Sequence, residues 1–580
     1  MRAVFPDDPG SHGSLANFVT TRYQRRMDHK VPDASPCRRT RRVARRLTTA
    51  ALTALAVSAV SAAIGPSAAH PQRVQKGGTF RIAFPAQAVD SIDPFLTALP
   101  AMGFVHAATC ASLLNRRDAP LPEGLRSVPE LAERLPEITN RGRTYTFTVR
   151  RGYRFSTGAP VTARDIAASV KRILSPTLNS FGVQDYYAIV GARAFNRGTT
   201  TALPGVRVRG NRITFRLTKP QPDFAEIVGT TCVLPASLPI NREGTRAPVP
   251  SAGPYTISRY APGRQIVVER NRFYRGPRPH HVDRFEITLV EDQTALVSEV
   301  ERGAYDWAWT QQQVLTPQVP RLARRYGVNR NRFFVAPGRG LCMFTLNASR
   351  PLFHNNPKLR RAVNYALDRK ALVRELGPRV GVATDQYLRP PELAFRDVRI
   401  YPSRPNLAKA KALARANRRS GRAVFYTRDD LLGRNHGAIV RANLAEIGID
   451  VQVKPVAAPA LFEALARRGE PFDIGWICFI GASLEALNLH RFFDGRTLDD
   501  PSHFNFSHFD SQRVSRRLDE VGRLSGRAFS RAYGRLDVEL ARDYAPAVAY
   551  AYLNELTFVS ARTGCVVLRP ALDLAAVCLK

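Results

Sequence analysis

The histidines are the side chains of this chain that could most readily bind a metal or act as a base. Two clusters stand out, His280-His281 and the pair His503 and His508. No cysteine or carboxylate stands at ligand spacing beside His280-His281, where a zinc site would need one. We therefore interpret both clusters as surface histidines near arginine and proline rather than as a metal or base site.

Acidic pairs and catalytic motifs also fail to indicate an enzyme. Asp429-Asp430 and Asp499-Asp500 lie in polar stretches, and adjacent residues do not face each other as an acid and a base must. The sequence contains no Gly-x-Ser-x-Gly, His-Glu-x-x-His or Walker A motif. We expect no catalytic residues, no cofactor and no metal site, and therefore a protein that is not an enzyme.

The charge balance is strongly basic. The chain has 86 Lys and Arg residues against 48 Asp and Glu residues, a net charge of +38. Such a charge can serve a polyanionic partner. The arginines are scattered, however, and lack the interleaved aromatics of a nucleic-acid-binding motif. We expect dispersed surface charge and no nucleic-acid partner, and keep a secreted basic protein that binds polyanions as the alternative function.

The N-terminus predicts export. Six arginines between Arg38 and Arg46 precede an apolar, small-residue stretch at 47–64, and Ser67-Ala68-Ala69 resembles a cleavage site. A membrane anchor is the alternative, but the stretch is short and is followed by helix-breaking Gly65-Pro66. The interpretation is a signal peptide cleaved near Ala69 and a protein of the periplasm or the outer face of the cell envelope.

Six cysteines follow the leader: Cys110, Cys232, Cys342, Cys478, Cys565 and Cys578. An even number in an exported chain favours disulfides, which could be connected in fifteen ways. Cys565 and Cys578 are close in sequence and are expected to pair, which would hold the C-terminal tail in place.

Residues 141–174 predict a strand, a turn and a helix. Aromatic and β-branched residues alternate with threonines over 144–149, as in a strand with one buried face. A turn follows at 156–160, and Thr162 with Asp165 forms an acidic capping box at the start of a helix. The apolar residues at helical spacing are Ile166, Val170, Ile173 and Leu174.

The rest of the chain predicts at least two lobes, since 580 residues are too many for one core. Hairpins are expected at 206–218 and 251–271, a helix around 99–114 and a strand at 305–310. Beyond residue 333 the pattern alternates between helices and strands, which is typical of an α/β lobe. The expected elements are helix 406–416, strand 422–427, helix 434–447, strand 449–454, helix 459–468 and strand 472–479.

Six segments between about residues 77 and 560 share a family pattern. They are GGTFRIAF, VPELAERLPEITNRGRTYTFTVRRGYRFSTGAPVTARDI, SAGPYTISRY with IVVERNRFYRG, RGAYDWAW, FTLNASRPLFHNNPKLRRAVNYALDRKALV and FDIGWICF. Together they resemble the family 5 extracellular solute-binding proteins, the oligopeptide-, dipeptide- and nickel-binding components of ABC importers. The resemblance implies capture of a ligand between two closing lobes and its delivery to a membrane permease.

The implied fold is α/β: a two-lobed periplasmic-binding-protein fold of the cluster C type, with an extra subdomain in lobe one. We expect the protein to be a monomer. The expected parts are an N-terminal extension and signal peptide at 1–69, lobe one at 70–333 with an inserted subdomain at about 115–245, lobe two at 334–544, and a return to lobe one with a disulfide-tied tail at 545–580.

The resemblance also implies disulfide pairings. In some oligopeptide-binding relatives a bridge links the strand entering lobe two to the strand that carries the Gly-Trp pair. Cys342 and Cys478 stand on the matching segments here. The remaining pair would then be Cys110 and Cys232, within lobe one.

One departure from the family concerns the ligand. Peptide-binding members usually place an Asp two or three residues after the strand Trp, where it pairs with the peptide's ammonium group. Here no carboxylate follows Trp476 before Glu485, and a buried ammonium needs a paired charge. N-terminal peptide capture is therefore in question unless Glu485 substitutes, and the ligand is either peptide-like or another small solute. No residue supports a nickel chelate or heme.

The resemblance places the ligand among aromatic and a few polar residues, as suits a binding cleft. The predicted ligand-contacting residues are Gln87, Asp90, Trp307, Trp309, Phe344, Asn347, Tyr387, Trp476, Phe479 and Glu485.

Overall fold

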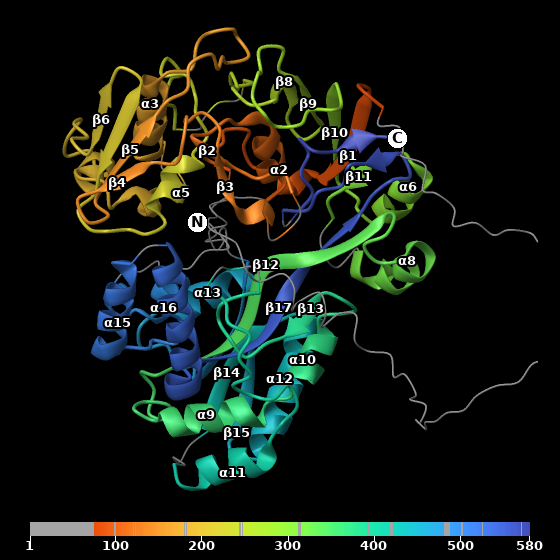
Figure 1. Cartoon of the computed structure of the whole chain (residues 1–580). Helices are drawn as coiled ribbons and strands as arrows, with labels where there is room; N and C mark the ends of the chain where they lie inside the picture. Colours follow the sequence, from red (N-terminus) through yellow and green to blue (C-terminus); the bar gives the residue numbers. More distant parts are fainter. Residues whose placement is uncertain are drawn as a thin grey trace, which may run out of the picture.

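The computed structural model describes residues 75–580 apart from short gaps. The gaps are 98–99, 120, 122, 179, 181, 243–244, 246, 311–314, 391, 393, 418–421, 481–487, 500–502, 525 and 570. The described part of the chain folds into two α/β lobes (Figure 1), as the sequence predicts. The predicted leader lies outside the described residues.

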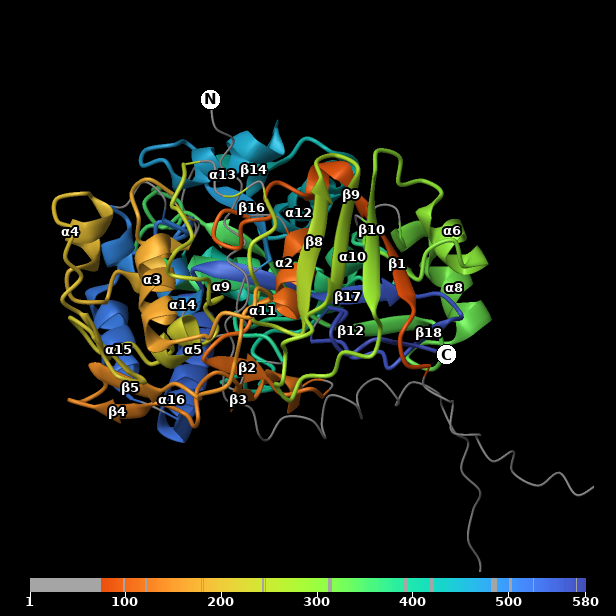
Figure 2. The ribbon, with the colours of Figure 1, turned by 90° about the horizontal axis from the view of Figure 1, so that it is seen from above.

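The first lobe is built on a five-stranded sheet in the order β11-β1-β10-β9-β8. Its strands β1, β10 and β11 run parallel, whereas β9 and β8 form an antiparallel hairpin. Figure 2 shows β8, β9, β10 and β1 side by side. The elements are β1 (Thr79–Pro85), the 3-10 turn η1 (Ala86–Ala88), α2 (Pro100–Thr109), β8 (Tyr255–Ala261), β9 (Gln265–Arg270), β10 (Arg284–Val290), α6 (Leu296–Arg302), β11 (Trp307–Ala308), η4 (Thr316–Gln318) and α8 (Val319–Tyr326).

Two of these elements are shorter than the sequence pattern indicates. The helix expected at 99–114 ends at Thr109, and the strand expected at 305–310 is only two residues long. Beyond the helix end the backbone bonds elsewhere: the Thr109 carbonyl accepts from Gly253 and the Ala111 carbonyl accepts from Val233. These long-range bonds outcompete another helical turn.

A second sheet of four strands, β4-β5-β7-β6, lies beside the first and has an apolar core of its own. Phe147 and Phe215 face each other in this core, and α3 covers it. The elements in and around it are β2 (Leu114–Arg116), η2 (Glu123–Leu125), β3 (Ser127–Pro129), β4 (Glu137–Thr139), β5 (Thr144–Thr148), α3 (Ala163–Ile173), η3 (Val183–Tyr186), α4 (Ala192–Asn196), β6 (Val206–Arg209), β7 (Arg212–Arg216) and α5 (Phe224–Gly229).

The strand–turn–helix predicted at 141–174 is confirmed. Tyr145 and Phe147 of β5 are buried while the alternating threonines are half-buried. At the start of α3 the backbone N–H of Thr162 donates to Asp165 Oδ2 over 2.8 Å, and the Thr162 hydroxyl donates to the same oxygen over 2.7 Å. The capping box is thus formed, and the apolar residues Ile166, Val170 and Ile173 of α3 are buried.

The second lobe contains a six-stranded sheet in the order β13-β17-β12-β16-β14-β15. Strands β14, β15 and β16 are parallel and joined by helices, which is the predicted βαβ pattern. The elements are α9 (Pro357–Ala366), α10 (Arg369–Glu375), β13 (Gly381–Ala383), α11 (Leu407–Arg415), β14 (Arg422–Arg428), α12 (Leu431–Ala445), β15 (Asp450–Val456), α13 (Ala458–Ala466), β16 (Ile474–Ile480), α14 (Asn488–Phe493), η5 (Gly495–Thr497), α15 (Gln512–Gly522), α16 (Gly526–Glu539) and the π-helical turn η6 (Leu540–Tyr544).

Two long strands join the lobes. β12 (Phe333–Leu346) and β17 (Ala547–Phe558) pair antiparallel from Phe333↔Phe558 to Thr345↔Ala547. One end of the pair packs beside α8 of the first lobe, and the other lies in the core of the second (Figure 1). After β17 the chain returns to the first lobe, where the tail strands β18 (Thr563–Gly564) and β19 (Cys578–Leu579) pair.

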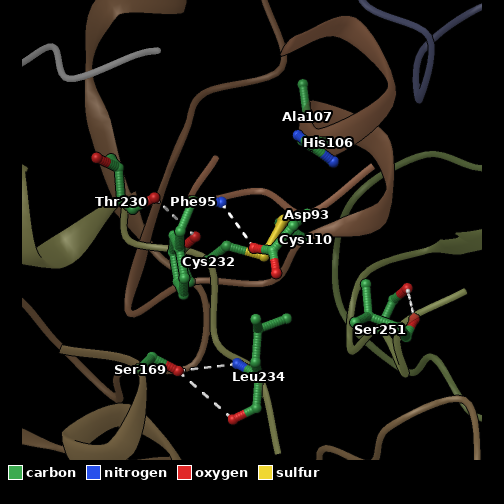
Figure 3. The surroundings of a disulfide bond; sticks show 12 residues. Asp93, Phe95, His106, Ala107, Cys110, Ser169, Thr230, Cys232, Leu234 and Ser251 are labelled. Atoms are coloured by element: carbon green, nitrogen blue, oxygen red, sulfur yellow. Dashed lines mark hydrogen bonds between the residues drawn. A yellow bond between two sulfur atoms is a disulfide. The ribbon is translucent and has the colours of Figure 1, made fainter. Parts of the chain in front are cut away.

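All three expected disulfides are present. Cys110–Cys232 joins the segment after α2 to the segment after α5, as Figure 3 shows. Cys342–Cys478 joins directly opposed residues of β12 and β16. Cys565–Cys578 closes the tail. The first two pairings are the ones that the family resemblance implies, and the third is the one expected from closeness in sequence.

Candidate functional site

The predicted ligand residues of the first lobe lie at one edge of its sheet. Gln87 and Asp90 follow β1, and Trp309 follows β11, the parallel strand beside β1. The carboxyl ends of parallel strands form the usual ligand edge of an open α/β sheet. Gln87 and Asp90 are exposed and Trp309 is half-buried. Asp90 Oδ1 accepts from the Thr97 hydroxyl over 2.7 Å, which orders the loop.

Trp307 differs from Trp309 because it is buried. Its ring packs edge-on against Phe84 at 5.7 Å and against Phe104 at 5.2 Å between centroids. Phe104 also contacts Trp309, at 6.3 Å. Trp309 is therefore the tryptophan that reaches solvent at this sheet edge, and Trp307 supports it from the core.

In the second lobe, Trp476 and Phe344 share one buried contact, Tyr550. Trp476 Nε1 donates to the Tyr550 hydroxyl over 2.9 Å, and Phe344 stacks on the Tyr550 ring with centroids 4.9 Å apart. Burial raises the pKa of Tyr550, so its hydroxyl stays protonated. Arg428 lies over the Trp476 ring at 5.3 Å. These aromatic side chains fill the centre of the lobe.

Asn347 and Tyr387 use their polar atoms on the backbone. Asn347 Nδ2 donates to the Phe472 carbonyl over 3.0 Å, and its Oδ1 accepts from Ser349. The Tyr387 hydroxyl donates to the Ala547 carbonyl over 2.9 Å. Both side chains are buried. They fix the chain at the lobe-two ends of β12 and β17.

Phe479 lies near the end of β16, three residues after Trp476. It packs edge-on against Phe492 at 5.1 Å and Phe504 at 5.5 Å. Glu485, the predicted substitute for the missing Asp, lies outside the described residues. The structure thus brings Gln87, Asp90 and Trp309 to one sheet edge, and it places the other described candidates in cores.

A set of charged residues at the boundary between the lobes was not predicted. Arg491 Nη2 of α14 donates to Asp185 Oδ1 of η3 over 2.8 Å, so the side chains bridge the two lobes. Asp223, just before α5, interacts electrostatically with both. No local spacing relates these residues, which are 306 positions apart at the widest. Only the three-dimensional fold brings them together.

The histidine pair is buried, which corrects its interpretation as surface histidines. His503 Nε2 bonds to the Ala466 carbonyl over 3.0 Å and His508 Nε2 to the Leu465 carbonyl over 2.8 Å. These carbonyls belong to the last turn of α13, where backbone acceptors lack helical partners. The two rings therefore cap a helix end.

No candidate metal site is found among the described residues, where no group of three or more His, Cys, Asp or Glu side chains could hold an ion. Of the acidic pairs, Asp430 caps α12 by accepting from Gly433 N over 2.9 Å, and Asp499 pairs with Arg468 at 2.9 Å. Over the same part of the chain, every helix is too short or too polar to cross a membrane.

Comparison with known families identifies the class. Residues 126–491 match the model of the bacterial extracellular solute-binding proteins, family 5. The match covers more than half of the chain, and the protein belongs to this family.

Individual relatives are distant. The oligopeptide-binding protein OppA of Bacillus subtilis is 26% identical over 250 residues, 41% of this chain and 45% of the relative. Heme-binding protein A of Haemophilus influenzae is 26% identical over 367 residues, 59% and 64% of the two chains. The matches thus span roughly half to two thirds of these relatives' length.

Solved structures share the fold over most of the chain. The clavulanic acid biosynthesis oligopeptide binding protein 2 superposes with a TM-score of 0.77 at 24% identity, covering 87% of this chain and 96% of the other. The peptide-bound DppA of Helicobacter pylori gives 0.65 at 18% identity, covering 87% and 98%.

Proposed function

We propose that this protein is an extracytoplasmic solute-binding protein that captures a small solute between its lobes and delivers it to the permease of an ABC transporter. Family membership together with two lobes joined by β12 and β17 carries the proposal. A paired two-strand connection lets lobes rotate about it as rigid bodies, which couples closure to ligand contact with both sides.

The proposed ligand is a peptide or a peptide-like solute. Relatives are named for oligopeptides, dipeptides and heme. The absence of an acidic residue directly after Trp476 argues that the ligand's amino group, if it has one, binds elsewhere. The proposed first contacts are the exposed Gln87 and Asp90 with Trp309 on the first lobe, and Glu485 beyond β16 on the second.

The remaining predicted residues take supporting roles in this proposal. Trp307, Phe344, Asn347, Tyr387, Trp476 and Phe479 hold the sheet edges and strand ends in place. The protein works as an exported monomer after cleavage of the leader near Ala69, with lobe one at 70–333 and 545–580 and lobe two at 334–544.

Native mass spectrometry of protein purified without refolding tests the function. We expect a bound solute of peptide-like mass, released on denaturation, and a rise in melting temperature with peptide pools. Protein that carries no solute and ignores peptide pools would contradict peptide binding. Binding of heparin or another polyanion that falls steeply with salt would favour the polyanion alternative, since release of counterions gives that dependence.

A further inference from the structure

The contact between Asp185 and Arg491 joins elements that are each anchored in a different core. Next to Asp185, Tyr186 is buried and its hydroxyl bonds to Thr231 Oγ1 at 2.6 Å. On either side of Arg491, Leu489 and Phe492 are buried in the core of the second lobe. The two charged side chains therefore stand on rigid supports, and their separation follows the separation of the lobes.

The neighbouring elements of the contact place it in each lobe. β16 ends at Ile480, and α14 with Arg491 begins at Asn488, directly after the stretch that contains Glu485. On the other lobe, Asp185 is tied to Gln221, whose Nε2 donates to the Asp185 carbonyl over 3.5 Å.

Asp223 lies at the same boundary as a second carboxyl group. Its Oδ1 is buried and has no hydrogen-bond partner in the described part of the chain. The charges of Asp185 and Arg491 act on it, and it in turn acts on Tyr533 of α16 and Tyr145 of β5. One arginine thus faces two carboxyl groups.

His490 and Lys219 are further titratable groups at this boundary. His490 stacks on Tyr533 with centroids 5.7 Å apart, and Lys219 of the first lobe acts on it across the boundary. Burial lowers the pKa of His490 to about 4, so its ring is neutral near pH 7. Asp494 and Asp519 of the second lobe also act on His490. Next to Asp223, Arg491 of the second lobe faces Asp185 and Asp223 of the first.

We propose that Asp185 and Arg491 form an electrostatic latch that stabilises the closed arrangement of the lobes, and that Asp223 modulates it. Asp185 and Asp223 belong to the same lobe, so their repulsion is present in the open and the closed arrangement alike. Ionised Asp223 loses hydration at the closed boundary, and this cost outweighs its attraction to Arg491, so it opposes closure. Protonated Asp223 removes that opposition and leaves the Asp185–Arg491 pair intact.

The test measures the distance between the lobes in the ligand-free full chain. Spin labels on unnatural residues replace Leu135 of the first lobe and Leu431 of the second, which are 51% and 65% exposed. Pulsed electron resonance then gives the populations of closed and open molecules. Asp185→Asn and Arg491→Gln should each lower the closed-to-open ratio about two- to fivefold, the usual range for a partly exposed ion pair.

Two further variants make the result decisive. The charge swap Asp185→Arg with Arg491→Asp should restore much of the closed population, because it rebuilds the pair in reverse. The control is Arg422→Gln, which breaks a 2.7 Å pair with Asp450 inside the second lobe and should leave the ratio unchanged.

Single variants with the wild-type distribution, or a swap as open as the single variants, would overturn the latch. The measurement needs no ligand, so it is independent of what the protein binds. A negative result here would overturn the latch and leave the proposed function unaffected. A failure to find a bound solute would leave the latch unaffected.

Discussion

The strand–helix stretch at 141–174 and the segment 474–493 hold their shapes by different means. In the first, the defining bonds join Thr162 to Asp165, three residues away. In the described residues of the second, 474–480 and 488–493, three contacts reach distant elements: Cys478 to Cys342, Trp476 to Tyr550, and Arg491 to Asp185.

This difference separates a scaffold from a working surface. Local hydrogen bonds form together with the helix and do not depend on the relative arrangement of the two lobes. Long-range contacts exist only in the folded lobe, and the last of them only while the lobes touch. We therefore expect perturbations of 141–174 to change the stability of the first lobe, and perturbations of 474–493 to reach both stability and closure.

The largest expected effect comes from removing Cys342–Cys478. The bridge spans 136 residues, against 13 for Cys565–Cys578. In the loop-entropy model the double Cys→Ala variants should lose about 5 and about 3 kcal/mol respectively. Denaturant unfolding measures the losses, and hydrogen exchange should show β16 deprotected while α3 keeps its protection. Equal losses, or deprotection of α3, would contradict the separation of the two regions.

Within 141–174, Asp165→Ala should have the next largest effect. The carboxylate accepts from Thr162 twice and from Ala236 N over 2.9 Å, so three donors lose their partner. We expect a loss of about 2–3 kcal/mol. Thr162→Ala, which keeps the bond from Ala236, should cost only about 1 kcal/mol. Equal losses of unfolding free energy in the two variants would show that the hydrogen bond from Ala236 does not contribute to stability.

In the second region, Tyr550→Phe should cost about 1–3 kcal/mol, because it leaves the buried Trp476 Nε1 without an acceptor while keeping the ring stack on Phe344. The matched control is Tyr426→Phe in the same lobe. That hydroxyl bonds to Glu470 and Lys454, which can turn to water, so its loss should be the smaller one in denaturant unfolding. The reverse order would show that Trp476 finds another partner.

The two regions also mark how far the sequence predicts the molecule. Strand β5, helix α3 and the βαβ pattern after residue 406 follow from period, caps and turns, and are confirmed within a few residues. The helix expected to reach 114 stopped at Thr109 because its next backbone groups bond to distant segments. Three features depend on packing between residues far apart in the sequence, which no local pattern contains. They are the exposure of the predicted ligand residues, the histidines that cap a helix end, and the Asp185–Arg491 pair.

The smallest expected effect is the pH dependence of closure. Burial and the nearby charge of Asp185 raise the pKa of Asp223 to about 7 in the arrangement where the lobes touch. In the open arrangement Asp223 regains water and its pKa falls, so the closed form binds the proton more tightly. Closure is therefore favoured below the raised pKa and weakens as pH rises through about 7.

We expect a fall of about two- to threefold in the closed-to-open ratio between pH 6 and pH 8, below the tenfold per pH unit that one proton permits, because Asp223 is only half-buried. His490 does not contribute, since its lowered pKa keeps it neutral over this range. Asp223→Asn should hold the closed population constant across the same range. A pH response that survives in this variant would place the proton elsewhere and leave the latch to Asp185 and Arg491 alone.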